Sequence, residues 1–197
     1  VDHLSLYQLT IEEGTPFYGL HKMGKLVVPD GDQSALLYEA TQDITARHGM
    51  PAYEVSNHAR PGAESRHNLT YWRYGDYAGI GPGAHGRLTR GRSKIATATE
   101  RRPETWLEQV EAQGHGMIDQ ETLGFEEQAD ELLLMGLRLK EGVDLARWQE
   151  LSGRDPDPVR EERLLEHGFI ERLGNSRLRC TPSGMLILDA VVADLAC

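Results

Sequence analysis

Aromatic, imidazole and glycine residues gather in one stretch of the chain, between Tyr53 and Gly86. Rings with polar tips, imidazoles and bare backbone amides suit a flat, partly polar ligand better than a plain hydrophobic core. We therefore begin with this stretch as the candidate binding region. Its aromatic and polar members are His67, Asn68, Tyr71, Trp72, Tyr74 and Tyr77.

The sharpest motif in this stretch is the hexapeptide HNLTYW, residues 67–72. Neutral imidazole is a common ligand of haem iron, and aromatic rings pack well on the face of a porphyrin. One hypothesis makes His67 an axial haem ligand or a polar contact, with Tyr71 and Trp72 as an aromatic wall. The alternative is structural: His67 caps a turn and Trp72 fills a core, as most buried aromatic residues do.

A glycine-rich segment, GIGPGAHG at residues 79–86, follows the aromatic residues. Its amides could line a loop against an anionic or polar cofactor. The spacing matches neither the dinucleotide fingerprint nor a Walker loop. A tight strand crossing is the alternative, since it also calls for glycine. His85 is a second candidate ligand, although a single histidine between glycines is more often a surface or turn residue.

Composition excludes several classes of function. The net charge of −10 disfavours a polyanionic partner such as DNA, and no apolar run approaches the roughly 18 residues of a membrane helix. Cys180 and Cys197 have no neighbouring ligand set for zinc, and so low a cysteine content suits a reducing cytoplasm. The first residue is Val1, not Met, and it enters a strand-like pattern at once, which indicates a chain cut inside a domain. No secretory signal is visible at the start.

The elements that position the stretch begin with a predicted strand over residues 4–11, where apolar and more polar residues alternate. A helix is predicted over 32–48 and a second strand over 53–56. This order is that of a right-handed α/β unit. Tyr7 and Thr10 lie near the C-terminal end of the first strand, where parallel sheets place ligand contacts.

Beyond residue 100 the pattern becomes helical, and Pro103 suits the start of a helix. Three helices, a hairpin and a final helix resemble a winged-helix domain. From Glu121 to the C-terminus 16 acidic residues outnumber 9 basic ones, and this net charge of −7 argues against DNA binding. The predicted elements are helices over 104–113, 126–139, 145–151 and 155–167, hairpins with turns at Gly91-Arg92 and Gly174-Asn175, and a last helix from Thr181-Pro182.

Four segments resemble one family of proteins: LSLYQLTIEEGT, YEVSN, HNLTYWRYGDYAGIGPGAHG and MGLRLKEGV. They look like the C-terminal half of HemW-type haem chaperones, which are radical S-adenosylmethionine (SAM) proteins similar to the oxygen-independent coproporphyrinogen III oxidases. The resemblance implies an α/β fold, with the C-terminal part of a partial (β/α)6 radical-SAM barrel followed by a mainly helical, winged-helix-like domain. It places the barrel portion, with a sheet extension, at residues 1–100 and the HemN-type C-terminal domain at 101–197.

The resemblance also implies cofactors and their sites. The family binds a [4Fe-4S] cluster through a CxxxCxxC motif near the start of the barrel. That motif is absent here, so no cluster ligand is expected in this chain, and the chain alone is expected to be inactive as an enzyme. The implied SAM contacts are Tyr7, Thr10, Gly79, Ile80, Gly81 and Gly83, and the haem-binding candidates are His67, Asn68, Tyr71, Trp72 and His85.

The resulting hypothesis is that the chain is part of a HemW-like haem chaperone. Such a protein would bind haem and deliver it to haem-accepting apoproteins in the cytoplasm, with [4Fe-4S] and SAM held outside this chain. The alternative is an oxygen-independent coproporphyrinogen III oxidase, which acts by radical SAM decarboxylation in porphyrin biosynthesis. A nucleic-acid-binding winged helix is the weakest of the three. Open sheet edges would favour a homodimer, and neither nucleic acid nor a membrane span is expected.

Overall fold

The computed structural model describes residues 1–174 and 176–196. They form two compact units, one of residues 1–64 and one that begins at Ser65, and each is described by itself. The predicted turn at Gly174-Asn175 includes a residue outside the described part of the chain, and Cys197 also lies outside it. The predicted domain boundary between residues 100 and 101 stays a prediction.

The first unit contains β1 (His3–Ser5), α1 (Pro16–Lys22), α2 (Gly31–Arg47) and β2 (Asn57–Ala59). Side-chain caps begin both helices, because the Thr15 hydroxyl and the Asp30 carboxylate each accept a hydrogen bond from a backbone amide of the first turn. The helix predicted over 32–48 is confirmed as α2. The short helix α1 was not predicted.

The two predicted strands of this unit are wrong in extent, and the predicted parallel pairing is wrong. β1 ends at Ser5 and pairs antiparallel with β2, with Leu4 opposite His58. Residues 53–56 turn because the buried Glu54 carboxylate accepts hydrogen bonds from Ser56 N and from the Asn57 side chain. An alternating pattern becomes a strand only where a partner strand completes its hydrogen bonds. In the described structure residues 7–11 belong to no strand.

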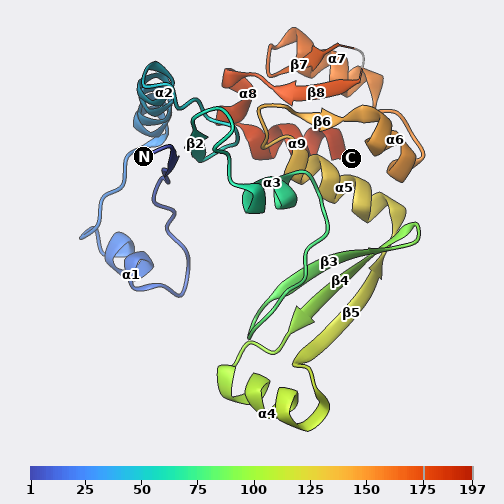
Figure 1. The fold of residues 1–197 in the computed structure, drawn as a ribbon. Helices are drawn as coiled ribbons and strands as arrows, with labels where there is room; N and C mark the ends of the chain where they lie inside the picture. Colours follow the sequence, from blue (N-terminus) through green and yellow to red (C-terminus); the bar gives the residue numbers. More distant parts are fainter. Residues whose placement is uncertain (175, 197) are drawn as a thin grey trace. The chain divides into compact units, whose positions relative to one another are not determined.

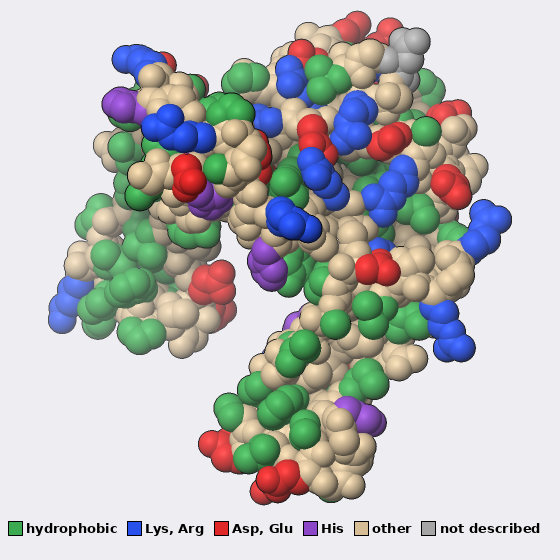
Figure 2. Space-filling model, viewed as in Figure 1, with side chains coloured by type: hydrophobic (Ala, Val, Ile, Leu, Met, Phe, Trp, Pro, Cys, Tyr) green, Lys and Arg blue, Asp and Glu red, His purple; other side chains and the backbone are tan. Residues whose placement is uncertain are grey.

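α2 keeps its apolar face exposed. Leu36, Leu37 and Ile44 are 65%, 54% and 55% exposed, and Figure 2 shows further hydrophobic side chains at the surface over α1. Among the described residues of this unit, the buried ones are mostly polar, namely Thr45, Glu54, Asn57 and His58 together with Ala59. The first unit therefore rests on polar contacts more than on a hydrophobic core.

The second unit begins with α3 (Arg66–Trp72) and a three-stranded antiparallel sheet. The sheet has the order β3 (His85–Arg90), β4 (Ser93–Thr99), β5 (Met117–Leu123), and α4 (Pro103–Gln113) connects β4 to β5. Figure 1 shows α4 at one end of this sheet. The predicted hairpin around Gly91 and the helix from Pro103 are confirmed. β5 was not predicted, because its residues are exposed on both faces and show no alternation of apolar and polar types.

The tail of the second unit, from residue 125 onward, has the winged-helix order of elements that the sequence predicted. Its three strands form an antiparallel sheet in the order β6-β8-β7, and α5 contacts both α6 and α9 (Figure 1). The two-residue strand β6 is too short to leave a sequence pattern. The elements are α5 (Phe125–Gly136), β6 (Val143–Asp144), α6 (Leu145–Ser152), α7 (Pro158–Glu166), β7 (Ile170–Leu173), β8 (Arg177–Cys180), α8 (Pro182–Leu186) and α9 (Leu188–Ala196).

The tail buries a continuous hydrophobic core. Its apolar residues recur at helical spacing on α5 and α9 and alternate on β8, so that one face of each element is buried. Trp148 of α6 is 1% exposed, and Leu137 and Leu178 are fully buried. The core includes Ala129, Leu132, Leu133, Leu137, Leu139, Val143, Trp148, Leu164, Ile170, Leu178, Val191 and Leu195.

Candidate functional site

The predicted haem motif forms the short helix α3. Ser65 begins it, because its hydroxyl accepts a hydrogen bond from Asn68 N at 3.3 Å. The exposed His67 ring lies 4.7 Å from the Tyr71 ring, one helical turn further on, at an angle of 72°. The Tyr71 ring lies 4.2 Å from that of Tyr77 in the following segment. We call His67, Tyr71 and Tyr77 the aromatic row.

Trp72 points toward α5, away from the aromatic row. Adjacent residues of an α-helix project about 100° apart, so the side chains of Tyr71 and Trp72 lie on different faces of α3. The Arg138 guanidinium lies 5.7 Å from the centre of the Trp72 ring. Trp72 also lines a cavity of about 280 Å³ together with Leu132 and Gly136 of α5. The structure therefore brings His67 and Tyr71 together and separates Trp72 from them, whereas Tyr77, outside the predicted site set, joins the row.

Charged side chains from β3 and α5 lie near Tyr77 of the aromatic row. The Arg87 guanidinium donates hydrogen bonds to both carboxylate oxygens of Glu131, at distances of 2.7 to 3.2 Å. Burial raises the pKa of Glu131, but the hydrogen bonds from Arg87 and the positive charge of its guanidinium outweigh this effect, so that the pKa lies below its usual value. Burial, together with the adjacent Glu131 carboxylate, raises the pKa of Tyr74. Burial also raises the pKa of Tyr77.

Close packing of backbone explains two glycines of the predicted cofactor loop. A Cβ atom at Gly79 would lie 2.5 Å from the carbonyl oxygen of His85, and one at Gly86 would lie 2.5 Å from the Thr97 hydroxyl. Both positions thus exclude any side chain. The tight crossing that was the alternative interpretation of this segment is present, and His85 itself is exposed at the first residue of β3.

The amides of the same loop are partly used within the protein. Gly83 N donates to Glu100 O at 2.7 Å, and Ala84 N donates to the Thr99 hydroxyl at 2.8 Å. That hydroxyl in turn donates to Gly81 O at 2.6 Å. The Ile80 side chain is 88% exposed on the loop. The role of Gly79, Ile80, Gly81 and Gly83 at a cofactor stays a prediction, and Ile80 is the member of this set with a free apolar surface.

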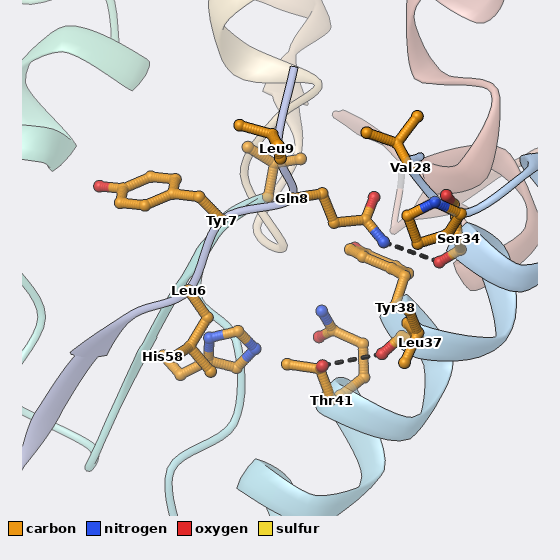
Figure 3. A pocket seen from close by; sticks show the side chains of 13 residues that line it. Leu6, Tyr7, Gln8, Leu9, Val28, Ser34, Leu37, Tyr38, Thr41 and His58 are labelled. Atoms are coloured by element: carbon orange, nitrogen blue, oxygen red, sulfur yellow. Dashed lines mark hydrogen bonds between the residues drawn. The ribbon is translucent and has the colours of Figure 1, made fainter. Parts of the chain in front are cut away.

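The other predicted SAM contacts belong to the first unit. A cavity of about 390 Å³ lies there between residues 6–9 and α2, and Tyr38 and His58 are among its lining side chains (Figure 3). Gln8 bridges its edge by donating to Ser34 O at 2.7 Å. The Tyr7 side chain points away from α2 and is 76% exposed (Figure 3), and Thr10 is exposed as well.

The residues that the structure describes do not fit an iron–sulfur cluster. Among the described residues, no group of three or more His, Cys, Asp or Glu side chains could hold a metal ion. Cys180 is buried on β8, and burial raises the pKa of its thiol to about 11, whereas cluster ligands are thiolates. Within the described part of the chain, no helix is both long and apolar enough to span a bilayer.

Comparison with known proteins identifies relatives over almost the whole chain. Residues 125–187 match the model of the HemN C-terminal domain. The chain is 40% identical to mouse (Mus musculus) radical S-adenosyl methionine domain-containing protein 1, mitochondrial, over 98% of the chain and 46% of that protein. It is 35% identical to the heme chaperone HemW of Bacillus subtilis (strain 168), over 96% of the chain and 50% of that protein. The chain thus spans about half the length of the curated relatives it matches.

The fold has a solved counterpart. The structure of Escherichia coli coproporphyrinogen III oxidase (HemN), described as a radical SAM enzyme, superposes with a TM-score of 0.70 at 14% sequence identity. The match covers 99% of this chain and 48% of that one. At this identity the likeness concerns the fold alone, and it confirms the predicted α/β class with a HemN-like C-terminal domain.

Proposed function

The chain belongs to the HemW- and HemN-like family of radical SAM proteins, and on this premise we propose that it is the haem-holding part of a haem chaperone. The aromatic row carries the proposal. His67 would ligate the iron of haem, and the Tyr71 and Tyr77 rings would pack against the macrocycle. Haem is the cargo in this proposal, to be handed on to a haem-accepting apoprotein.

The geometry of the row suits a cargo that is bound and then released. His67 is exposed and lies at the outer end of the row, whereas Tyr71 and Tyr77 are half-buried. An exposed axial ligand can exchange with a ligand from an acceptor protein, because no side chain has to move aside to admit it. The half-buried rings would hold the macrocycle by apolar contact, which tolerates exchange of the iron ligand.

In this proposal the ligands of the [4Fe-4S] cluster lie outside this chain, whereas some contacts to SAM lie within it. A [4Fe-4S] cluster would need cysteine ligands, and Cys180 is unsuited to that role. SAM would be contacted by Ile80 and the neighbouring glycines, and by Tyr7 and Thr10. We derive no radical step for this chain, and the oxidase alternative has no observation of this structure in its favour beyond the shared fold.

The acidic tail makes nucleic acid an unsuitable partner, since phosphate binding depends on clustered Lys and Arg. The proposed compartment is the cytoplasm; the mitochondrion, which the names of the animal relatives give, is the alternative. A homodimer through open sheet edges is part of the proposal as well.

Haem titration of the whole chain tests the proposal. We expect wild type to shift the Soret band of haem, and His67→Ala to weaken the apparent affinity by about tenfold or more, since loss of an axial ligand removes a bond to iron. His48→Ala, which removes another exposed histidine at the end of α2, is the matched control and should bind as wild type does. Equal Soret shifts and affinities for wild type and His67→Ala would exclude His67 as the ligand.

A further inference from the structure

The C-terminal end of the motif helix is fastened to the winged-helix tail. The Arg73 guanidinium, which follows α3 directly, donates to both oxygens of the Glu141 carboxylate, at 2.9 and 2.8 Å. Glu141 lies in the segment between α5 and β6. Arg177 at the start of β8 reaches the same carboxylate at 3.5 Å and donates to Glu141 O at 2.8 Å. One carboxylate thus joins α3 to two elements of the tail.

A second contact holds the backbone at the same end of α3. Arg147 of α6 donates to Arg73 O at 2.7 Å and to Tyr74 O at 2.9 Å. The carbonyl groups at the end of a helix lack partners within the helix, and a cation there also suits the helix dipole. Tyr74 turns the chain away with φ of 52° and is itself buried. The C-terminal end of the helix is therefore held by side chains of the tail.

A short helix depends on such fastening. α3 has seven residues, and isolated helices shorter than about 12 to 15 residues are marginal in water. Within α3, His67 and Tyr71 come into contact only while the turn between them is helical. Loosening the C-terminal end would therefore disturb the spacing of the aromatic row, although the Glu141 carboxylate is bonded to Arg73 and Arg177 and to no residue of the row in the described part of the chain.

We propose that Glu141 is a positioning residue, through which the winged-helix tail holds the motif helix and sets the geometry of the aromatic row. The part of this inference that concerns haem rests on the proposed function. A partner that docks on the tail and displaces Glu141 from Arg73 would loosen α3. The tail would then act as the element that makes release of haem dependent on the acceptor.

Ordinary surface ion pairs contribute little to stability. The contact at Glu141 differs from them because Arg73 donates to both carboxylate oxygens and Arg177 reaches the same carboxylate. The pair between Arg179 and Glu171 on β7 and β8 has similar exposure and a single contact at 2.8 Å, and it does not involve α3. Glu171→Gln is therefore a matched control for Glu141→Gln. Arg73→Lys is a second variant, which keeps the charge and loses the fork.

Hydrogen exchange of the whole chain without haem tests the fastening. In Glu141→Gln we expect the amides at the C-terminal end of α3, residues 70–74, to exchange about tenfold faster than in wild type, because the end of the helix opens locally. In Arg73→Lys these amides should exchange at a rate between those of wild type and Glu141→Gln, and in Glu171→Gln they should exchange at the wild-type rate. Unchanged exchange of these amides in Glu141→Gln, with the tail amides also unchanged, would overturn the inference.

Haem titration of the same variants tests the coupling. We expect Glu141→Gln to weaken haem binding by about three- to tenfold relative to wild type, with a broadened Soret band, while Glu171→Gln binds as wild type does. Full affinity in Glu141→Gln would overturn the coupling. If His67→Ala also bound haem as wild type does, the proposed function would fail, and the exchange experiment would still decide whether Glu141 holds α3.

Discussion

The two ends of the chain bury different kinds of side chain. The tail of the second unit encloses a core of leucine, valine and isoleucine around Trp148, with Leu137 and Leu178 fully buried. The first unit buries Glu54, Asn57 and His58, while the apolar face of α2 stays exposed. Both regions contain helices and strands, so the kinds of secondary structure present do not distinguish them.

The difference shows which region is specified by its own sequence. The helices and strands of the tail pack their apolar faces against one another, so that the hydrophobic residues are buried within the domain itself. The first unit instead leaves apolar side chains of α2 exposed, and grouped exposed apolar side chains are typical of an interaction surface. Its buried Glu54 and Asn57 side chains are hydrogen-bonded to each other. The stability of such a buried polar network depends on every member, because loss of one leaves another without its hydrogen bond.

The same substitution in both regions gives the largest contrast. Leu137→Ala should destabilise the tail by about 2–5 kcal/mol, because it leaves a cavity in a filled core. Leu36→Ala, at a position 65% exposed, should change stability by less than about 0.5 kcal/mol. Urea unfolding followed by circular dichroism measures both. Similar losses for the two variants would break the comparison, because Leu36 would then be buried by a surface outside the described contacts.

Removal of Asn57 tests the polar side of the comparison. The Asn57 amide donates to Glu54, and Ser5 Oγ donates to Asn57 Oδ1 at 2.5 Å across the β1–β2 pair. Asn57→Ala should cost about 1–3 kcal/mol, since it leaves the buried Glu54 carboxylate without one of its donors. Hydrogen exchange confined to residues 1–64 is the suitable measurement. Exchange as slow as in wild type would mean that apolar contacts hold this unit after all.

The smallest expected effect is a pH dependence of the second unit. The hydrogen bonds from Arg73 lower the pKa of Glu141 below its ordinary value of 4.5. A carboxyl group whose folded pKa is lowered stabilises the fold above its unfolded pKa, and this contribution is lost as the pH falls through the folded pKa. The Tm of the second unit should therefore fall on acidification below about pH 5. Glu141→Gln and Arg73→Gln should both reduce that slope, and parallel slopes in all three proteins would contradict the assignment.

Much of the tail could be predicted from sequence because its signals are local. Helical periodicity marked α5, and Thr181 followed by proline marked the start of α8, where the Thr181 hydroxyl accepts from Gly184 N at 3.1 Å. The first unit was harder. Residues 4–11 alternate as a strand does, yet only β1 forms, because pairing depends on a partner that local pattern does not reveal.

The candidate site divides in the same way. His67 and Tyr71 could be paired in advance once their segment is read as a helix, since four-residue spacing places them on one face. Tyr77 contacts Tyr71 from outside the helix. The different direction of Trp72 follows from the same helical geometry, because adjacent residues project about 100° apart. The glycines at 79 and 86 were recognised as positions of close approach, but what approaches them is a backbone and a hydroxyl of this chain.

The sequence by itself determined α2, α4, most helices of the tail, the Thr181 cap, the hairpin around Gly91 and the resemblance to a family, because these depend on residues a few positions apart or on motifs read directly. The tertiary structure alone decided which residues hold the HNLTYW helix in place. Arg73 and Glu141 lie 68 positions apart, and Arg147 reaches the same helix end from 74 positions away. No local sequence pattern predicts these contacts, because the residues come together only after the tail has packed its core.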